Sequence, residues 1–383
     1  MRKSRLMTPG PVAVPERVQL AMALPLVHHR APEFTPIFRE VRENLKRVFQ
    51  TECDVLVLAS TGSGAMEAAV SNLLSPGERA VVVRGGKFGE RWGELCEVYG
   101  IEPTFVDVEW GDSVEPEAVR AAFEATPQAR ALLVQASETS TGAYHPIEAL
   151  ARIVRESDER LLIVDGISAV GAHDLRMDDW GIDALVSGSQ KSFMLPPGLA
   201  FVALSERASE RMQTTSGPRY YFDLRKEAAA QAREQTAWSA AVSLLVGLRE
   251  SLRMILDSGL EATFEHHATL CRATRAAMRA LGLELLARTP SHACTAVRVP
   301  EGVDGKDLVR RMRDDHGMTI AGGQSQLAGR IFRIGHLGWV DGYDMLSVVA
   351  ALESVLADLG WPVKTGAGIC ACAEQLRADG GGA

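Results

Sequence analysis

The sequence predicts an α/β protein, in which a large domain with a mostly parallel sheet sandwiched by helices precedes a smaller C-terminal α/β domain. Short apolar runs alternate with amphipathic stretches between residues 55 and 204, which is typical of consecutive βαβ units. The runs are continuously apolar, and this indicates strands that are buried on both faces. The chain of 383 residues also exceeds the length that one core normally supports, so we expect two domains.

Each apolar run of the large domain is interpreted as a strand and each amphipathic stretch as a helix. Ligands of parallel α/β sheets gather at the carboxyl ends of the strands, and we therefore expect the functional residues there. In chain order we expect strand 55–60, helix 64–74, strand 80–83, helix 89–100, strand 131–137, helix 145–157 and strands 161–166, 184–189 and 199–204.

A second α/β unit follows a helical segment at residues 237–256. Glycines at 282 and 317 indicate where two of its helices end. Its expected elements are helix 264–282, strand 293–300, helix 305–317, strand 330–338 and helix 344–360. The predicted division is an N-terminal arm (1–20), a large domain (21–256), a small domain (257–362) and a flexible tail rich in Ala, Gly and Cys (363–383).

Composition argues against several classes of function. The net charge is −8, and no block of Lys and Arg is present that could neutralise a nucleic acid backbone. No window approaches the roughly 18 apolar residues of a membrane span, and no apolar segment follows the basic N-terminal residues, so we expect a cytoplasmic protein. The six cysteines lack zinc-ligand spacing, and we expect reduced thiols and no metal.

A glycine-rich turn, STGSG at residues 60–64, joins the first expected strand to its helix. The free N–H groups and the dipole at a helix start attract anions, so Thr61, Gly62 and Ser63 are candidate phosphate ligands. The turn matches neither the dinucleotide-binding glycine pattern nor the Walker pattern. A plain tight turn between a strand and a helix would have a similar sequence.

Two residues of opposite charge follow neighbouring predicted strands. Asp165 ends the run LLIVD, and Lys191 comes one βα unit later, just after ALVSGS. Adjacent parallel strands would aim both side chains at the same crevice. A helix cap or an ion pair is the structural alternative for Asp165, and a simple ion pair is the alternative for the couple.

A buried lysine beside an aspartate also suits pyridoxal phosphate. A desolvated lysine can form a Schiff base with the aldehyde of this cofactor, and an aspartate can keep its pyridine nitrogen protonated. With the phosphate turn, three of the four parts that the cofactor needs are placed. The fourth is a flat group over its ring.

Five short motifs are specific as a set, through their order and spacing. They are STGSGAMEAA at 60–69, SETSTG at 137–142, IVDGISAVG at 163–171, SGSQK at 187–191 and FRIGHLG at 332–338. Together they resemble the class V aminotransferases, the alanine-glyoxylate and serine-pyruvate group of fold-type I pyridoxal phosphate enzymes. The resemblance extends from the N-terminal MTPGPVAVPERV to about Gly360. It implies the fold-type I architecture and pyridoxal 5'-phosphate as the cofactor.

The resemblance also implies catalytic and phosphate-binding roles. Lys191 would form the Schiff base and then act as the acid and base of the reaction. Asp165 would face the ring nitrogen and make the ring an electron sink. The phosphate ligands implied within the chain are Thr61, Gly62, Ser63 and Gln190.

Three further residues would contact the cofactor ring. Phe88 would stack on one face, Ile167 would close the opposite face, and Ser140 would reach the edge of the ring. Without the resemblance, a core side chain is an equally good interpretation of Phe88, and a residue that stabilises a turn is the alternative for Ser140.

Arg333 matches the residue that binds the substrate α-carboxylate in this family, a role that suits the planar fork of a guanidinium. An arginine in an apolar strand can otherwise pair with a structural carboxylate. Relatives are homodimers in which the neighbouring subunit completes the site, through a segment that matches REQTAWS at 233–239. Thr236 fits their phosphate-binding threonine. Arg233 stands where several relatives have tyrosine, and Trp238 alters a proline-containing turn.

The function implied is a ping-pong transfer of an amino group from a small amino acid of the alanine or serine type to a small 2-oxo acid such as glyoxylate or pyruvate. Two alternatives remain. One is a lyase or desulfurase of the same fold, for which Cys294 is the candidate nucleophile, although a buried structural thiol is the simpler interpretation of its strand. The other is a non-catalytic subunit of a complex that keeps the cofactor.

Overall fold

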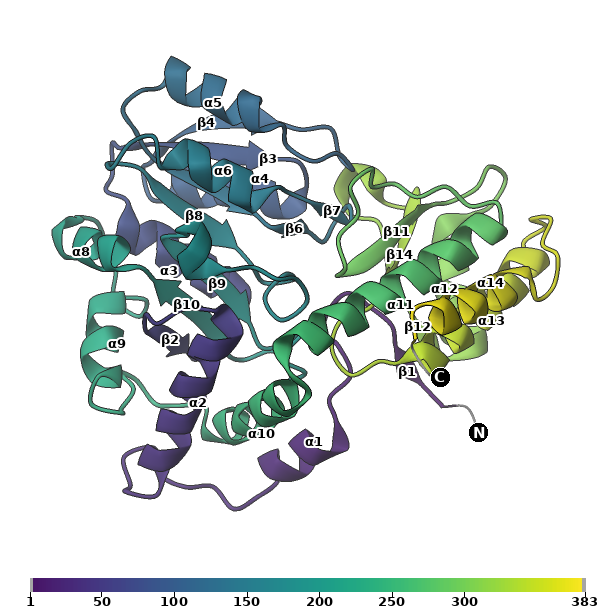
Figure 1. Ribbon diagram of the computed structural model, residues 1–383, viewed down its shortest axis with the longest axis horizontal. Helices are drawn as coiled ribbons and strands as arrows, with labels where there is room; N and C mark the ends of the chain where they lie inside the picture. Colours follow the sequence, from purple (N-terminus) through teal and green to yellow (C-terminus); the bar gives the residue numbers. More distant parts are fainter. Residues whose placement is uncertain (1–2, 381–383) are drawn as a thin grey trace.

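The computed structural model describes residues 3–380, and a seven-stranded sheet forms the centre of its larger body (Figure 1). All neighbouring strands are parallel except β10, which is antiparallel to both of its neighbours. This confirms the mostly parallel sheet. In spatial order the strands are β2 (Val55–Leu58), β10 (Ala200–Leu204), β9 (Ala184–Gly188), β8 (Leu161–Asp165), β5 (Ala129–Gln135), β3 (Arg79–Arg84) and β4 (Glu102–Asp107).

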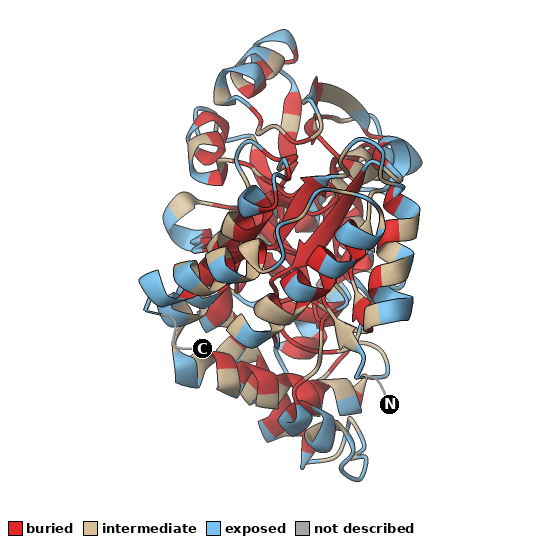
Figure 2. Ribbon diagram, turned by 90° about the vertical axis from the view of Figure 1, so that its right-hand side faces the viewer, coloured by how far each residue is buried: buried red, intermediate tan, exposed pale blue. Residues whose placement is uncertain are grey.

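Helices cover both faces of this sheet, and Figure 2 shows the strands buried between them. Successive strand residues point to opposite faces, so Val164 packs in one core and Ile163 in the other. One face carries α2 (Phe34–Phe49), α5 (Pro116–Ala125), α6 (Ile147–Val154), α7 (Met177–Trp180) and α10 (Val242–Ser258). The opposite face carries α3 (Gly62–Leu73), α4 (Lys87–Val98), α8 (Glu206–Thr214) and α9 (Leu224–Gln231).

A smaller body contains an antiparallel sheet with its own core. Its strands are β11 (Cys294–Arg298), β14 (Ile331–Gly335) and β13 (Ala321–Gly322), packed with α11 (Leu260–Ala280), α12 (Gly305–His316) and α13 (Gly342–Asp358). The N-terminal segment joins this body, because β1 (Arg5–Leu6) pairs with β12 (Met318–Thr319). The remaining short elements are α1 (Glu16–Met22), β6 (Ser137–Glu138), β7 (Ala143–Tyr144) and η1 (Ser325–Leu327).

The segment expected to be a flexible tail forms a helix instead, α14 (Ala367–Ala378). Cys372 and Leu376 are buried in the core of the smaller body, and Ile369 packs against it. These residues recur at helical spacing, which the Ala, Gly and Cys composition concealed. The flexible-tail prediction was therefore wrong for the described part, and residues 381–383 of that tail lie outside the described residues.

Several elements of the larger body were not predicted from the sequence, among them α2, β4, α5, α8 and α9. Strand β4 was missed because it is an edge strand whose one buried residue is Val106 and whose sequence contains a proline. The helix expected from residue 237 begins at Val242 instead.

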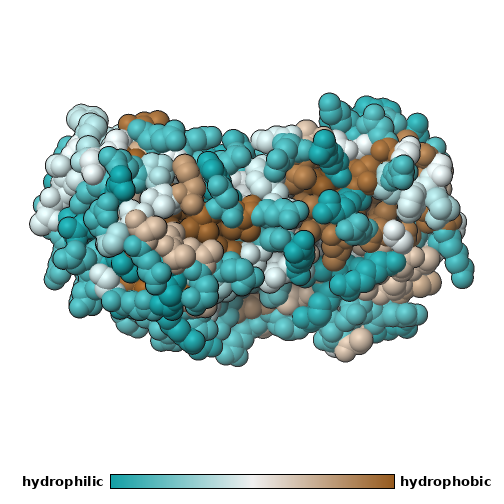
Figure 3. Space-filling view, turned by 90° about the horizontal axis from the view of Figure 1, so that it is seen from above, coloured by the Kyte–Doolittle hydropathy of each residue, from teal (hydrophilic) through white to brown (hydrophobic). Residues whose placement is uncertain are grey.

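In the view of Figure 3, hydrophilic side chains cover most of the surface, with hydrophobic patches between them. None of the helices in residues 3–380 is long and apolar enough to cross a membrane.

Candidate active site

Asp165 and Lys191 lie at the same edge of the central sheet. Asp165 is the last residue of β8, and Lys191 follows the end of β9, its parallel neighbour. Both are buried, with 4% of Asp165 and 8% of Lys191 exposed. The crevice at the carboxyl ends of these strands therefore holds a carboxylate and an amine, as the order of the strands predicted.

Burial shifts the titration of both groups toward neutrality. Burial raises the pKa of Asp165 to about 7, although its carboxylate accepts the Ile167 N–H at 2.8 Å. Burial lowers the pKa of Lys191 to about 8, opposed by the nearby Cys294 thiol and the Asp165 carboxylate. Near neutral pH an appreciable share of Lys191 is an uncharged amine, which is the form that acts as a nucleophile or base.

The N-terminal arm packs directly on the Lys191 side chain. The Lys191 amine donates a hydrogen bond to the carbonyl of Pro9. Gly10 has a φ of +126°, and a Cβ there would lie only 2.3 Å from the lysine Nζ. Only glycine suits this backbone conformation and this contact, so the arm is part of the site.

The predicted phosphate turn forms the start of α3. Thr61 is the N-cap with an extended backbone and no capping hydrogen bond from its own side chain, and Gly62 begins the helix. The first N–H groups of a helix have no partner within it. Thr61 and Ser63 are exposed, so the turn presents its polar groups outward.

Glycines bring this turn against the strand that leads to Lys191. A Cβ on Gly188 would lie 3.2 Å from the backbone nitrogen of Gly62 and 3.0 Å from Oε1 of Gln190. A Cβ on Gly62 would lie 2.5 Å from the Ile167 side chain. The candidate phosphate ligands Gly62 and Gln190 are therefore close together, beside Ile167.

Phe88 lies in the first turn of α4 and Ser140 in the turn after β6. Both contact Glu138, a fully buried carboxylate that the sequence analysis did not single out. The Phe88 N–H donates to Glu138 Oε2 at 3.1 Å, and the Ser140 N–H donates to Oε1 at 3.1 Å. Arg91 lies over the Phe88 ring and donates to the Ser63 hydroxyl at 3.0 Å, which links this turn to the phosphate turn.

Arg333 is a buried cation on β14, with 6% of its surface exposed. Among the described residues its guanidinium donates to backbone carbonyls only: Nη1 to Thr139 at 2.7 Å, and Nε and Nη2 to Gly322 at 3.1 and 2.7 Å. These bonds occupy three of its five N–H donors. One donor on each terminal nitrogen remains for an anion from outside, so no structural carboxylate takes the place of a substrate.

Cys294 is the first residue of β11, and its thiol lies 3.8 Å from the Thr139 carbonyl that also accepts from Arg333. It is fully buried, and burial raises the pKa of its thiol. A desulfurase needs a thiolate on a mobile loop. A buried thiol in a regular strand, as expected from the sequence, does not meet that need.

Arg233 and Thr236 lie between α9 and α10. Arg233 is exposed, and the Thr236 hydroxyl donates to the Trp238 carbonyl at 2.6 Å. The Trp238 ring stacks on Tyr221 at a centroid distance of 5.6 Å. None of the hydrogen bonds described for residues 3–380 joins Arg233 or Thr236 to Lys191 or Asp165.

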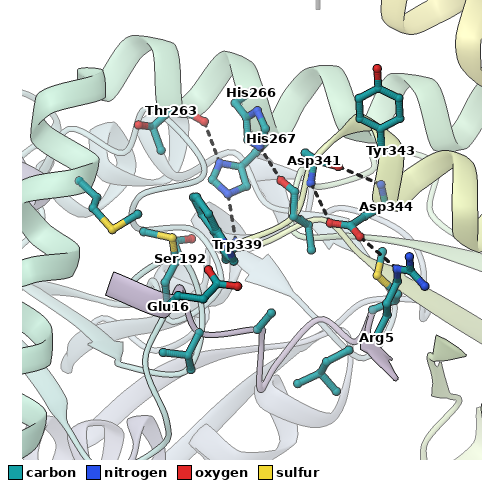
Figure 4. A pocket seen from close by; sticks show the side chains of 18 of the residues that line it. Arg5, Glu16, Ser192, Thr263, His266, His267, Trp339, Asp341, Tyr343 and Asp344 are labelled. Carbon is teal, nitrogen blue, oxygen red and sulfur yellow. Dashed lines mark hydrogen bonds and ion pairs between the residues drawn. The ribbon is translucent and has the colours of Figure 1, made fainter. Parts of the chain in front are cut away.

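A cavity of about 920 Å³ lies elsewhere, between the N-terminal arm, the α10–α11 junction and residues 338–347 (Figure 4). His266 and His267 hold one wall of it, since they hydrogen-bond Val340 at 2.8 Å and Gly338 at 3.3 Å. Its lining includes Ser192, which directly follows Lys191, and none of the predicted site residues. It is therefore distinct from the crevice at the strand ends.

A family model described as Aminotransferase class-V matches residues 19–334. The chain belongs to this family. Together with the relatives below, the match makes the chain a pyridoxal phosphate-dependent transaminase with the fold-type I architecture. The class-V aminotransferase described here contains, within residues 3–380, no group of three or more His, Cys, Asp or Glu residues that could hold a metal ion.

Relatives of this aminotransferase carry two kinds of name. The soluble hydrogenase small subunit of Synechococcus sp. (strain PCC 6716) is 43% identical, with 98% of each chain covered. The L-aspartate–glyoxylate aminotransferase of Paracoccus denitrificans (strain Pd 1222) is 39% identical, with 96% of this chain and 95% of the relative covered. The crystal structure of ureidoglycine-glyoxylate aminotransferase from Bacillus subtilis has a TM-score of 0.93 at 30% identity and covers 98% of this chain and 99% of its own.

The residues present in this aminotransferase fit pyridoxal 5'-phosphate. Oε1 of Gln190 is buried without a hydrogen-bond partner in the described part of the chain, and turning this amide over would direct its NH2 group, a donor, to a phosphate. The adjacent start of α3 has N–H groups that suit the same phosphate. Lys191 has the lowered pKa that a Schiff-base lysine needs, and Asp165 is a buried acid without a basic hydrogen-bond partner among the described residues. A protonated ring nitrogen would supply that partner.

Proposed function

We propose that this aminotransferase transfers the amino group of a small amino acid, of the alanine or serine type, to glyoxylate or pyruvate. The observation that carries the proposal is the buried lysine amine beside a buried aspartate, with an arginine that pairs with no carboxylate in residues 3–380. Relatives support the acceptor, because the Paracoccus protein is named an L-aspartate–glyoxylate aminotransferase and the protein from Methylorubrum extorquens, 33% identical, a serine–glyoxylate aminotransferase.

Arg333 would bind the α-carboxylate through its two remaining N–H donors and so orient the Cα–H bond toward Lys191. Nζ of Lys191 would remove the Cα proton in the first half-reaction and return a proton to Cα of the second substrate in the next. Asp165 would hold the proton on the ring nitrogen. Pyridoxal 5'-phosphate, when bound, supplies an electron sink for the charge that develops at Cα.

Other residues of the site would hold the cofactor phosphate and orient the Lys191 amine. The phosphate would be held at the start of α3 by Thr61, Gly62 and Ser63, with the amide of Gln190. The Pro9 carbonyl, which accepts from the Lys191 amine, would orient that amine and cover it against water.

The test is a screen of single amino acids. The purified protein is loaded with pyridoxal 5'-phosphate, and each amino acid is added without an acceptor, so that only the first half-reaction can proceed. Conversion of the cofactor absorbance to that of the aminated form, reversed by glyoxylate or pyruvate, is the expected result. If no small amino acid converts the cofactor while the cofactor remains bound, the proposal is wrong.

We also propose a homodimer in which Arg233 and Thr236 of one subunit contact the phosphate in the partner's site. An arginine beside a phosphate would form a charge-assisted hydrogen bond. Mixing Lys191→Ala protein with Thr236→Ala/Arg233→Ala protein should restore activity, because one site of each mixed dimer would then be intact. No recovery after subunit exchange would contradict the shared site.

A cytoplasmic location is likewise a proposal, tested by cell fractionation.

A second candidate function rests on the relatives named hydrogenase subunits, at 43% and 42% identity. In that case the chain would retain the cofactor and act as a subunit of a complex. Turnover of an amino acid and an oxo acid by the isolated chain would make such a complex unnecessary for activity. Bound cofactor without conversion by any amino acid would favour the subunit role.

A further inference from the structure

The first turn of α4 has no capping side chain of its own. Its N-cap residue is Gly86, and glycine offers no oxygen to the N–H groups of Lys87, Phe88 and Gly89. The start of a helix that is buried without partners for these groups loses stability. The partners must therefore come from elsewhere in the chain.

Glu138 and Ser140, which lie on another element, supply all three partners. The N–H groups of Phe88 and Gly89 both donate to Oε2 of Glu138 at 3.1 Å. The Lys87 N–H donates to the Ser140 hydroxyl at 3.0 Å. This hydroxyl and the Ser140 N–H both donate to Oε1 of Glu138, so one carboxylate holds the helix start and the serine together.

Glu138 is fully buried and closely surrounded by the start of α4 and by Ser140. It has no exposed surface, and a Cβ on Gly86 would lie 2.3 Å from its carboxyl carbon and 2.6 Å from the Ser140 hydroxyl. The hydrogen bonds described for its carboxylate come from neutral N–H and O–H groups, not from a cation. A buried carboxylate is costly, and an ordinary surface cap would not require this cost.

We propose that Glu138 is a positioning residue, which fixes Phe88 over the cofactor ring and Ser140 at its edge. This inference rests on the proposed function, since it assumes the cofactor in the crevice. Without the carboxylate the first turn of α4 would loosen, and cofactor binding would have to order it again. Glu138 would thus act on the cofactor only through its two neighbours.

The experiment compares Glu138→Gln and Glu138→Ala with the matched control Glu97→Gln, which alters an exposed carboxylate on α4, the helix that Glu138 caps. The dissociation constant for pyridoxal 5'-phosphate is measured by equilibrium dialysis. Because a helix cap contributes about 0.5–2 kcal/mol, affinity should fall roughly two- to thirty-fold. Glutamine keeps one acceptor oxygen and should lose less than alanine. The control should match the wild type.

Two further readouts separate positioning from general stability. The visible circular dichroism per bound cofactor should weaken in Glu138→Gln, because the ring is held less firmly, while thermal unfolding confirms that the variant is folded. In a Phe88→Ala background the Glu138→Gln change should cost less affinity than in the wild type, since residues that act through one another are not additive. Full additivity, or an unchanged dichroism, would overturn the positioning role.

Cofactor binding separates the two proposals, and hydrogen exchange at Lys87, Phe88 and Gly89 in the cofactor-free protein reports whether the first turn of α4 has loosened. Faster exchange in Glu138→Gln with weaker cofactor binding supports the inference. Normal cofactor binding by all variants overturns the inference and leaves the proposed function intact. If the wild-type protein itself binds no cofactor, both are overturned, whatever the exchange rates.

Discussion

Four ionisable side chains of the site are buried: Lys191, Asp165, Arg333 and Glu138. For each of them burial moves the pKa toward the neutral form. Charges that are buried without a full set of opposite charges lower stability, and such groups gather at functional sites. This loss of folding stability suits a pocket in which a cofactor phosphate, a ring nitrogen and a substrate carboxylate would supply the missing partners.

Replacing Arg333 by lysine should weaken substrate binding more than turnover. Lysine keeps the charge but loses the planar fork, so one charged hydrogen bond to the carboxylate is lost, at a cost of about 1.5–3 kcal/mol. The KM for the amino acid should rise roughly ten- to hundred-fold in steady-state kinetics. The same substitution at the exposed Arg330 is the control. A KM unchanged by Arg333→Lys would exclude carboxylate binding there.

The residues of the site differ in how far the sequence predicted them. Asp165 and Lys191 could be placed from strand ends alone, because apolar runs locate buried strands. Arg333 needed the family resemblance, since a strand pattern does not say which buried arginine lacks a carboxylate. Glu138 was missed, because in the SETSTG motif a role was assigned to Ser140 alone. An acidic residue directly after a buried apolar run was the available signal.

At the scale of elements, two helices are capped by carboxylates from other elements. Glu138 caps α4, and Glu353 of α13 accepts the N–H groups of Gly368 and Ile369 at the start of α14, at 2.7 and 3.1 Å. Both helices follow a glycine N-cap. A cap that is distant in sequence cannot be found from local capping patterns, so neither of these caps was predicted.

The packing of α14 can be tested at Leu376, which is 3% exposed. Truncation to alanine leaves a cavity in the core of the smaller body, so the free energy of unfolding should fall by about 2–5 kcal/mol. Urea denaturation measures the change. Glu374→Ala, on the exposed side of the same helix, should change it by less than about 0.5 kcal/mol. Equal stabilities of Leu376→Ala and the wild type would mean that α14 does not pack as described.

At the scale of the whole molecule, stacked imidazoles join the two bodies. His173 stacks between Tyr144 and His292 at centroid distances of 4.3 and 4.1 Å, and its Nε2 accepts the His292 N–H at 3.0 Å. His173 follows β8 of the larger body, and His292 precedes β11 of the smaller one. Burial holds the pKa of His173 well below its usual range, so this contact depends on neutral rings.

Acid should therefore weaken the fold by protonating buried histidines, and His267 allows this effect to be tested. Burial, with His266 nearby, lowers the pKa of His267 to about 3 from 6.5. Between these values the unfolded chain binds a proton that the folded chain does not, so the stabilising contribution is complete above about pH 6.5 and declines as pH falls. From pH 7.5 to 5, wild type should lose about 2 kcal/mol more unfolding free energy than His267→Gln.

Urea denaturation at the two pH values measures this difference, and the exposed His28→Gln is the control. The comparison of variants cancels the opposing effect of carboxyls such as Asp165, whose pKa is raised to about 7. Parallel losses in wild type and His267→Gln would show that His267 is already charged in the fold.

The most direct measurement traps the cofactor on the chain. The protein is incubated with pyridoxal 5'-phosphate, reduced with borohydride and digested, and the modified peptide is sequenced by mass spectrometry. We predict a single adduct, on Lys191. The Lys191→Ala variant should carry no adduct and should catalyse no amino transfer. An adduct on another lysine, or amino transfer that persists in Lys191→Ala, would contradict the account.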